Sequence, residues 1–426
     1  MMYTGVVGFS SYFPPNVRSC SELLYLRRKA GRMLGWSTYI LASLKKYGSR
    51  FDILYSIIPS LCQHNRYTIR SEFGVNVDIV EFPVRRIVKN IYDYKDYNAI
   101  VSFISNINKE ELIIYTHNLF SLNFAYELLI FFSKLKKINK NITIVAHQHS
   151  QPPFKYYSES LGKLKGSAIG VAGEFLFKLL HKYIDGYVVS NKKTFHYLVD
   201  EMNIDPSTVL YQHVGVDYEN VNPAKYRAYM HIVEEKVWKN CDYRLVLVSK
   251  VTRNYGGYVK GVDLVPHVVS MLRKLGYRAC IAVIGEILDK ELALKLKSTN
   301  GIILTDHLPR DEVFKIVASS DLYILPARSN YYYGGIGVAV IEALALNIPV
   351  VSPTLEHVPD ERVVKYLGVK AKWVDTAGIS RFVRDIVHAL DNITQFRPRQ
   401  YSIRFYDIRI MVNNLEKLFT SLTRKI

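Results

Sequence analysis

Short apolar runs alternate with helix-period segments along most of the chain, and this alternation constrains the fold more than any other feature. In the first half the runs are TGVVGFS, FDILYSI, ELIIYTH, ITIVAHQ and DGYVVS. In the second half they are RLVLVSK, ACIAVIGE, GIILTD, DLYILPA and PVVSP. Helical stretches such as 262–275 and 310–319 lie between them. Strands that alternate with helices in this way predict α/β units with parallel sheets.

The length of 426 residues predicts two domains of about 200 residues each. Turn residues and a proline in GVDYENVNPAKY, residues 215–226, end the first series of strands. We therefore expect doubly wound domains over 1–220 and 225–400. The tail, 401–426, has apolar residues at helical spacing, which predicts a helix that packs back toward the first domain. These residues are Ile408, Met411, Leu415, Leu418 and Leu422.

Composition excludes several classes of protein. Disorder is excluded because 49% of the residues are hydrophobic. The apolar run 122–132 contains Asn123 and Glu127 and is too short for the roughly 20 residues that span a bilayer. The first residues lack the pattern of a signal peptide, so we expect a cytoplasmic protein. The cysteines lie far apart without a C-x-x-C pair, which predicts reduced, mostly buried thiols rather than a disulfide framework or a zinc ribbon. They are Cys20, Cys62, Cys241 and Cys280.

The charge of the chain is strongly positive and unevenly distributed. The formal net charge is +18, and from Arg18 to Arg50 eight Lys and Arg residues face one acid, Glu22. Such a segment attracts phosphate groups of nucleotides, nucleic acids or anionic lipids, although it can also be a plain solvated face. No nucleic-acid-binding motif accompanies the basic residues, so nucleic acid is not an expected partner.

The segment SNYYYGGIGVAVIEALALNIPVVSP, residues 329–353, predicts a loop, a helix and a strand that follow the strand DLYILPA. Gly334, Gly335 and Gly337 would let backbone N–H groups approach a phosphate at the start of the helix. Glu342, in the second turn, can accept hydrogen bonds from ribose hydroxyls. The alternative is a tight glycine turn followed by a solvated glutamate.

Other strand ends in the second half carry polar groups as well. Lys250 ends one strand, and Lys260 with Gly261 opens the helix after it. Two cations beside a glycine-bearing loop suit a diphosphate leaving group, although two surface lysines would also fit the pattern. Gly285 and Glu286 end the next strand. Ligands bind at the carboxyl ends of strands in such sheets, so each of these residues is a candidate.

The order VSKV…KG, IAVIGE, GIILTDHLPRDEVFKIVASSDLYILPA and GGIGVAVIEALALNIPVVSP resembles the donor-binding domain of family-4 retaining glycosyltransferases. The resemblance implies a GT-B fold, with two facing Rossmann-like domains. It places Lys250 and Lys260 on the donor diphosphate and Glu342 on the ribose. It also implies donor contacts from Gly285, Glu286 and the 334–337 loop, Gly334-Gly335-Ile336-Gly337.

The sequence departs from the family pattern at one donor position. A glutamate normally lies eight residues before the ribose glutamate, and here that position is Gly334. The missing acid usually contacts donor-sugar hydroxyls, so its absence bears on donor choice and on activity. Tyr331, Tyr332 or Tyr333 could supply hydrogen-bonding groups instead, and Tyr333 is included among the candidate donor-binding residues.

Histidines end two strands in the first half, His117 in YTHN and His147 and His149 in VAHQHS. A His-x-His pair can bind a metal, but the sequence indicates no third ligand, and structural histidines are the alternative. The resemblance places His147 near the donor sugar, with His149 in reserve on the acceptor side.

The acceptor side is less like the family. Gly35 matches the second of two acceptor-side glycines, and the segment before it carries Arg27, Arg28, Lys29 and Arg32. This basic, partly apolar segment fits peripheral contact with an anionic membrane that carries a lipid-linked acceptor, or a plain surface helix.

Rival nucleotide-binding classes lack their motifs in this sequence. There is no G-x-G-x-x-G after the first strand and no G-x-x-x-x-G-K-[ST]. No Asp-x-Asp motif occurs either, so we expect transfer without a metal or other cofactor. The resemblance thus implies a retaining glycosyltransferase that uses a UDP- or GDP-sugar and a glycan, lipid-linked or protein-linked acceptor. The alternative is a GT-B-shaped nucleotide- or glycan-binding protein without turnover, because Gly334 replaces the acid.

Overall fold

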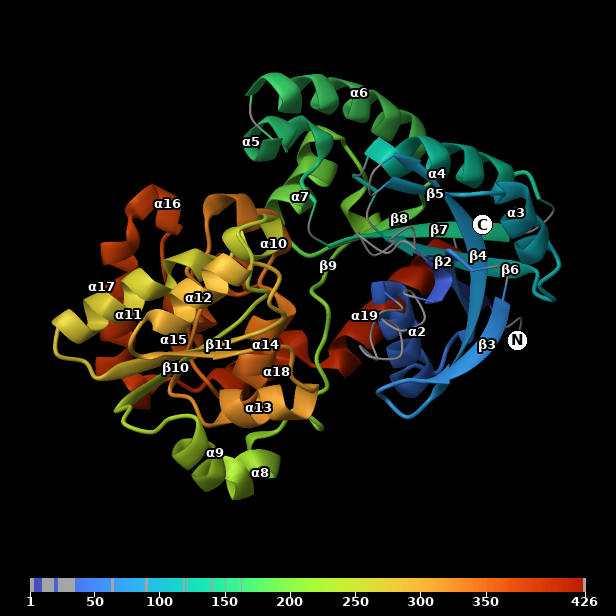
Figure 1. Ribbon diagram of the computed structural model, residues 1–426. Helices are drawn as coiled ribbons and strands as arrows, with labels where there is room; N and C mark the ends of the chain where they lie inside the picture. The colour runs from blue at the N-terminus through green and yellow to red at the C-terminus, as the bar shows by residue number, and fades with distance from the viewer. Residues whose placement is uncertain are drawn as a thin grey trace. The chain divides into compact units, whose positions relative to one another are not determined.

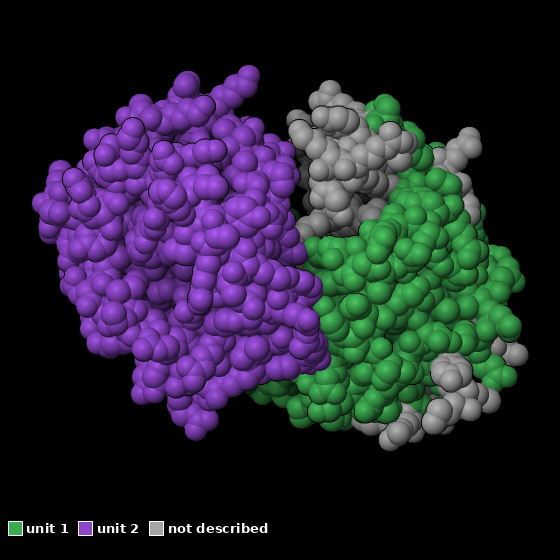
Figure 2. Space-filling model, turned by 90° about the horizontal axis from the view of Figure 1, so that it is seen from below, with its two compact units in different colours: residues 1–212, 411–426 green, residues 213–410 purple. Residues whose placement is uncertain are grey.

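The computed structural model divides the chain into two units, coloured separately in Figure 2. Unit 1 comprises residues 1–212 and 411–426, and unit 2 comprises residues 213–410. The structure describes residues 4–9, 19–21, 35–62, 65–88, 91–117, 119–120, 122–138, 141–149, 151–161 and 163–423.

The division between the units falls before the predicted boundary at 220–225. The chain joins unit 2 at His213 because the following residues pair with the segment before the tail. Val216 forms a parallel β-bridge with Asp407, and the Tyr218 hydroxyl donates to Ser402 Oγ at 2.8 Å. The last helix, α19 (Ile408–Thr423), therefore starts in unit 2 and continues into unit 1 from Met411.

The sheet of unit 1 has the order β3-β4-β2-β1-β6-β7-β8-β9. Its strands are β1 (Gly5–Phe9), β2 (Asp52–Ser60), β3 (Asn65–Arg70), β4 (Asn76–Val88), β5 (Ile91–Tyr94), β6 (Glu111–His117), β7 (Asn141–Gln148), β8 (Gly186–Val189) and β9 (Val209–Tyr211). β3 and β5 pair antiparallel with β4, whereas the pairs from β4 through β2 to β9 are parallel.

Helices cover both faces of this sheet. Figure 1 shows α4 (Leu122–Leu135) and α6 (Lys163–His181) on one face, and α2 (Gly35–Tyr47) and α19 on the other. Met411, Leu415, Leu418 and Leu422 of α19 are buried, so the predicted helical tail is present. Further helices in the described part of unit 1 are α3 (Tyr97–Ser105), α5 (Tyr157–Leu161) and α7 (Lys192–His196).

The sheet of unit 2 is parallel, with the order β12-β11-β10-β13-β14-β15. Its strands are β10 (Tyr243–Val248), β11 (Ala279–Ile284), β12 (Ile302–Thr305), β13 (Leu322–Ile324), β14 (Val350–Ser352) and β15 (Gly368–Lys370). Numbered from β10, this is the order 3-2-1-4-5-6 of a dinucleotide-binding sheet. The strand order reverses between β10 and β13, and that reversal is the switch point where such sheets bind ligands.

Figure 1 shows helices on both faces of the unit 2 sheet. The longer ones are α11 (Val265–Lys274), α12 (Lys290–Ser298), α13 (Arg310–Ala318), α14 (Val338–Ala345), α17 (Ile379–Asp391) and α18 (Pro398–Tyr406). The shorter ones are α8 (Pro223–Tyr226), α9 (Met230–Lys236), α10 (Tyr255–Tyr258), α15 (Val364–Leu367) and α16 (Val374–Ala377). None of the helices in the described part of the chain is long and apolar enough to cross a membrane.

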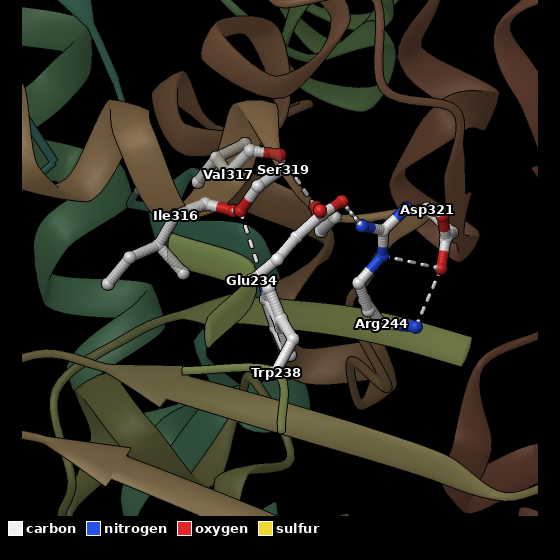
Figure 3. Close-up of polar contacts among 8 residues, drawn as sticks. Glu234, Trp238, Arg244, Ile316, Val317, Ser319 and Asp321 are labelled. Carbon is white, nitrogen blue, oxygen red and sulfur yellow. Dashed lines mark hydrogen bonds and ion pairs between the residues drawn. The ribbon is translucent and has the colours of Figure 1, made fainter. Parts of the chain in front are cut away.

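A polar anchor lies at the amino-terminal end of the unit 2 sheet. Figure 3 shows the Arg244 guanidinium between the carboxylates of Glu234 and Asp321. Arg244 N donates to Asp321 Oδ2 at 2.7 Å, and Asp321 N donates to Arg244 O at 2.7 Å. Trp238 Nε1 donates to Ser319 Oγ at 2.8 Å in the same group. These contacts join β10, the segment before β13 and the connecting helix α9.

The prediction of reduced cysteines is wrong, because all four cysteines form disulfides. The pairs are Cys20–Cys62 and Cys241–Cys280. The second pair joins the segment before β10 to β11, because Cys241 lies two residues before β10 and Cys280 is the second residue of the neighbouring parallel strand β11. Sequence spacing missed both pairs because each joins residues about 40 positions apart.

Candidate active site

The two loops that flank the switch point of unit 2 are joined to each other. Arg328 N, after β13, donates to Val259 O, after β10, at 2.9 Å. A Cβ added at Gly261 would lie 2.1 Å from Pro326 O, and the residue has φ +72°, so this close approach requires glycine. Arg328 also makes a two-pronged ion pair with Asp263, with N–O distances of 2.9 and 2.8 Å. Sequence reasoning did not identify this pair, which fixes the two loops as one surface.

The two predicted diphosphate lysines both lie at this switch point. Lys250 is exposed, with 61% of its side chain accessible, and its ammonium lies 3.3 Å from Glu286 Oε2. Lys260 is half-buried, and its Nζ lies 5.9 Å from the centroid of the Tyr331 ring. Burial, together with the neighbouring Lys250 charge, lowers the pKa of Lys260 below the ordinary lysine value. An added anion would relieve the repulsion between these two cations.

The glycine turn between β13 and α14 is packed against Tyr331. A Cβ at Gly334 would lie 2.7 Å from a ring carbon of Tyr331, so the tyrosine ring fills the space where a side chain at 334 would begin. The Tyr331 hydroxyl reaches to 3.0 Å from the position of a Cβ at Gly337, which has φ +83° and precedes α14. Tyr331 is therefore the tyrosine beside the position of the missing acid.

Two other residues predicted for the donor loop are buried. Tyr333 is 2% exposed and Ile336 is fully buried, so their side chains support the turn from within. Gly337, with φ +83°, is the N-cap of α14. Gly335, with φ +62°, ends the preceding turn, and its N donates to Tyr332 O at 3.2 Å, so the predicted phosphate contact from this amide would compete with that hydrogen bond. Gly285 lies at the end of β11, beside Ser249 after β10, and Glu286 follows it.

Glu342 on α14 is held by an arginine that sequence reasoning missed. Arg310 Nη2, in the first turn of α13, donates to Glu342 Oε1 at 2.7 Å, and 13% of the Glu342 side chain is accessible. The guanidinium carbon of Arg310 lies 4.9 Å from the Phe314 ring centroid, which restrains it further. A carboxylate has about four lone-pair sites, so Glu342 can accept a hydrogen bond from a hydroxyl group while it is paired with Arg310. The segment LPRDE was the available signal, but spacing does not show that α13 faces α14.

The histidines of unit 1 form one group, and the third histidine comes from the neighbouring strand. His117 and His147 are register partners on β6 and β7, and His149 lies two residues further on. One ring nitrogen from each lies within 4.8 Å of the others. His117 Nδ1 and His149 Nε2 are 2.7 Å apart, and Tyr115 Oη is 2.6 Å from His147 Nδ1. Sequence reasoning named all three residues but found no third ligand, because strand pairing is what brings His117 to the pair.

Burial keeps the rings of His117 and His149 uncharged. It lowers the pKa of His149 to about 3, and burial with the contact to His149 lowers the pKa of His117 well below its ordinary value. Burial likewise raises the pKa of the Tyr115 phenol, which stays protonated. His117 and His149 are therefore neutral at physiological pH.

The remaining acceptor-side candidates are described only in part. Gly35 is the first residue of α2. Arg27, Arg28, Lys29 and Arg32 lie outside the described residues.

The site and the fold can be compared with known proteins. Residues 242–392 match the family model described as "Glycosyl transferases group 1". Over 146 residues the chain is 31% identical to sulfoquinovosyl transferase SQD2 of Arabidopsis thaliana. The matched region is 34% of this chain and 26% of that protein. The chain thus matches about a quarter of the length of that relative.

Solved structures match nearly the whole chain. Sucrose-phosphate synthase from Thermosynechococcus elongatus has a TM-score of 0.66 at 12% identity, covering 99% of this chain and 100% of that one. HepE from Anabaena in complex with UDP has a TM-score of 0.64 at 10% identity, covering 98% and 100%. The fold is GT-B. The catalytic domain of starch synthase IV from Arabidopsis thaliana, bound to ADP and acarbose, has a TM-score of 0.61 at 13% identity, covering 99% and 100%.

The GT-B fold confirms the predicted fold class, two Rossmann-like units, and the segment 242–392 lies wholly within unit 2. The switch point, the two lysines and Glu342 all lie inside that segment. Donor, acceptor and stereochemistry require arguments beyond the fold, because one fold hosts many functions.

Proposed function

We propose that this protein is a hexosyl- or related glycosyltransferase that moves a sugar from a UDP- or GDP-sugar to a glycan, lipid or protein-linked acceptor. One observation carries the proposal. Lys250, Lys260 and the turn before α14 converge at the switch point of a 3-2-1-4-5-6 sheet. The match of residues 242–392 to a glycosyl transferase family supports it. So do the UDP and ADP named with two structural neighbours.

In the proposed reaction, negative charge develops on the diphosphate as the bond to the sugar breaks. The ammonium groups of Lys250 and Lys260 neutralise that charge, assisted by the backbone N–H group of Gly337 at the start of α14. Glu342, oriented by Arg310, accepts hydrogen bonds from the ribose. Positive charge from the lysines and the amide removes the need for a metal at the diphosphate.

The resemblance to family-4 enzymes supports two finer features of this proposal. The acceptor attacks from the face that the diphosphate leaves, so the configuration at the anomeric carbon is retained. His149 and Gly35 belong to the acceptor side. Separately, the excess of basic residues that includes Arg27 and Arg28 supports docking of the protein on the inner, anionic surface of a membrane. Flotation with anionic liposomes tests the docking, with Arg27, Arg28, Lys29 and Arg32 changed together as the control.

The proposed function is tested by a thermal-shift screen of nucleotides in the presence of EDTA, followed by product analysis with the best donor. UDP-, GDP- and ADP-sugars form the panel, and the relative's name adds a sulfoquinovosyl donor. We expect stabilisation by one nucleoside diphosphate and transfer of its sugar with retained anomeric configuration. An absence of both saturable binding and turnover across the panel contradicts the proposal.

A second candidate function is binding of a nucleotide or glycan without turnover. One observation favours it, because the Tyr331 ring fills the space beside Gly334 where the family carries an acid. The same screen separates the two functions. Saturable binding of a nucleotide sugar with no hydrolysis and no transfer to any acceptor supports the binding protein.

A further inference from the structure

The histidine group of unit 1 has the chemistry of a metal site. We propose that His117, His147 and His149 form a binding site for a divalent transition metal ion, and that Zn²⁺ is the ion it fits best. Imidazole nitrogen is a preferred ligand of Zn²⁺, and three histidines with one open position form a known type of zinc site. The proposal does not rest on the glycosyltransferase function, since all three residues belong to unit 1.

The backbone brings the three rings to one face of the sheet. In the parallel pair β6–β7, His117 is the register partner of His147, and register partners point to the same face. His149 lies two residues beyond His147, and side chains alternate along extended backbone, so it shares that face. The ring centroids of His147 and His149 are 3.8 Å apart, and those of His117 and His149 are 4.9 Å apart.

The distances between the rings suit a small ion. Tetrahedral Zn²⁺ binds histidine nitrogen at about 2.0–2.1 Å, which sets nitrogen–nitrogen separations of about 3.3 Å. The three nitrogens lie within 4.8 Å of one another, and the closest pair, His117 Nδ1 and His149 Nε2, is 2.7 Å apart. A metal ion would take the place of the proton shared by that pair. Each ring then keeps its one proton on the nitrogen that faces away from the ion.

The surroundings of the rings already restrain them. Tyr115 Oη, 2.6 Å from His147 Nδ1, can accept a hydrogen bond from that nitrogen and so direct the other ring nitrogen toward the ion. The Ser190 hydroxyl donates to the His149 carbonyl at 2.7 Å. The Gln148 amide accepts from Leu119 N and donates to Gln151 O, both at 3.0 Å, which joins the segments after β6 and β7. Rigid strands and restrained rings are what a metal site requires.

Metal analysis of the intact chain tests the proposal directly. The full chain, freed of any polyhistidine tag, is produced in zinc-supplemented medium, dialysed and analysed by plasma mass spectrometry. We expect one zinc per chain in the wild type, and loss of most of it in His117→Gln and His149→Gln. The matched control is His196→Gln, which changes an exposed histidine of unit 1 and should keep the zinc.

Two further measurements guard against a folding artefact. Tyr115→Phe removes only the contact on His147 and should weaken zinc binding by about tenfold, the usual effect of losing a partner of a metal ligand. Replacement of zinc by Co²⁺ should give the visible absorption of a tetrahedral site. A zinc-free wild type overturns the proposal, as does wild-type zinc content in the His117 and His149 variants. Binding of UDP in unit 2, measured in EDTA, reports separately on the proposed function.

Discussion

In the proposed function, Lys260 is the residue whose charge state should most directly affect binding of a diphosphate in unit 2. Burial and the Lys250 charge lower its pKa, so it loses its proton at a lower pH than an ordinary lysine. The protonated form attracts the diphosphate. We therefore expect the affinity for the preferred nucleoside diphosphate to be highest below this lowered pKa, and to fall as pH rises toward the ordinary value of about 10.5. Titration calorimetry across this range measures the effect.

The matched variant for this prediction is Lys260→Arg. Arginine keeps its charge at every pH in the range, so the fall in affinity at high pH should be much smaller in the variant. Identical pH profiles for wild type and variant would show that another group controls the affinity.

The contact between Gly334 and the Tyr331 ring leads to a second prediction for single residues. Gly334→Glu restores the acid of the family pattern, but its Cβ would lie 2.7 Å from the Tyr331 ring. Overpacking costs about 1–3 kcal/mol, so we expect about tenfold weaker donor binding, measured by calorimetry. Gly334→Gln separates the steric effect from the charge, and Tyr331→Ala in the same chain should relieve the clash. Donor binding by Gly334→Glu alone that equals or exceeds the wild type would contradict this account.

Sequence reasoning found residues at strand ends but not the partners that hold them. Lys250, Lys260 and Glu342 were predicted from their place after apolar runs, and the structure brings the two lysines together at the switch point. Arg310, Arg328 and the pairing of His117 with His149 were not predicted. Each of these contacts joins elements that are far apart in the sequence, and local sequence patterns do not show which distant elements pack together.

At the scale of elements, Arg244 joins the two strands that flank the switch point. Removing it leaves Asp321 and Glu234 without this partner, and hydrogen bonds between charged groups contribute about 1.5–3 kcal/mol each in favourable cases. We expect Arg244→Ala to lower the free energy of unfolding by about 2 kcal/mol, measured by urea denaturation. The control is Arg278→Ala, which breaks an exposed pair with Asp242 and should cost much less. Equal losses in the two variants would contradict a role for this anchor.

Each predicted apolar run forms a strand, but the sequence did not predict β3, β4, β5, β9 and β15. β3 has the sequence NRYTIR, and its residues are exposed or half-exposed. It therefore lacks the alternation of buried apolar and exposed polar residues that identifies a strand in a sequence. β3 is held by backbone hydrogen bonds in its antiparallel pairing with β4, and such bonds leave no hydrophobic pattern in the sequence. Strand order was likewise beyond the sequence pattern, because order depends on which helix crosses which face.

At the scale of the whole molecule, the two disulfides contribute to stability. Each closes a loop of about 40 residues, for which the chain-entropy model gives about 3–4 kcal/mol. We expect no free thiol by alkylation and mass spectrometry under denaturing, non-reducing conditions, and a lower melting temperature after reduction. Cys241→Ser with Cys280→Ser should reproduce part of that loss. Alkylation of all four cysteines without reductant would contradict the pairing, and would favour the predicted cytoplasmic location.

The most direct test of the central claim is the rate of nucleoside diphosphate release from the best donor, measured for wild type, Lys260→Ala and Lys274→Ala. Lys274 is an exposed lysine of unit 2 in the last turn of α11, and its replacement controls for loss of charge. We predict turnover in the wild type and in Lys274→Ala, and a rate about 100-fold lower in Lys260→Ala, the usual effect of removing one group that stabilises developing charge. A near-wild-type rate in Lys260→Ala, or no release by the wild type from any donor, would contradict the account.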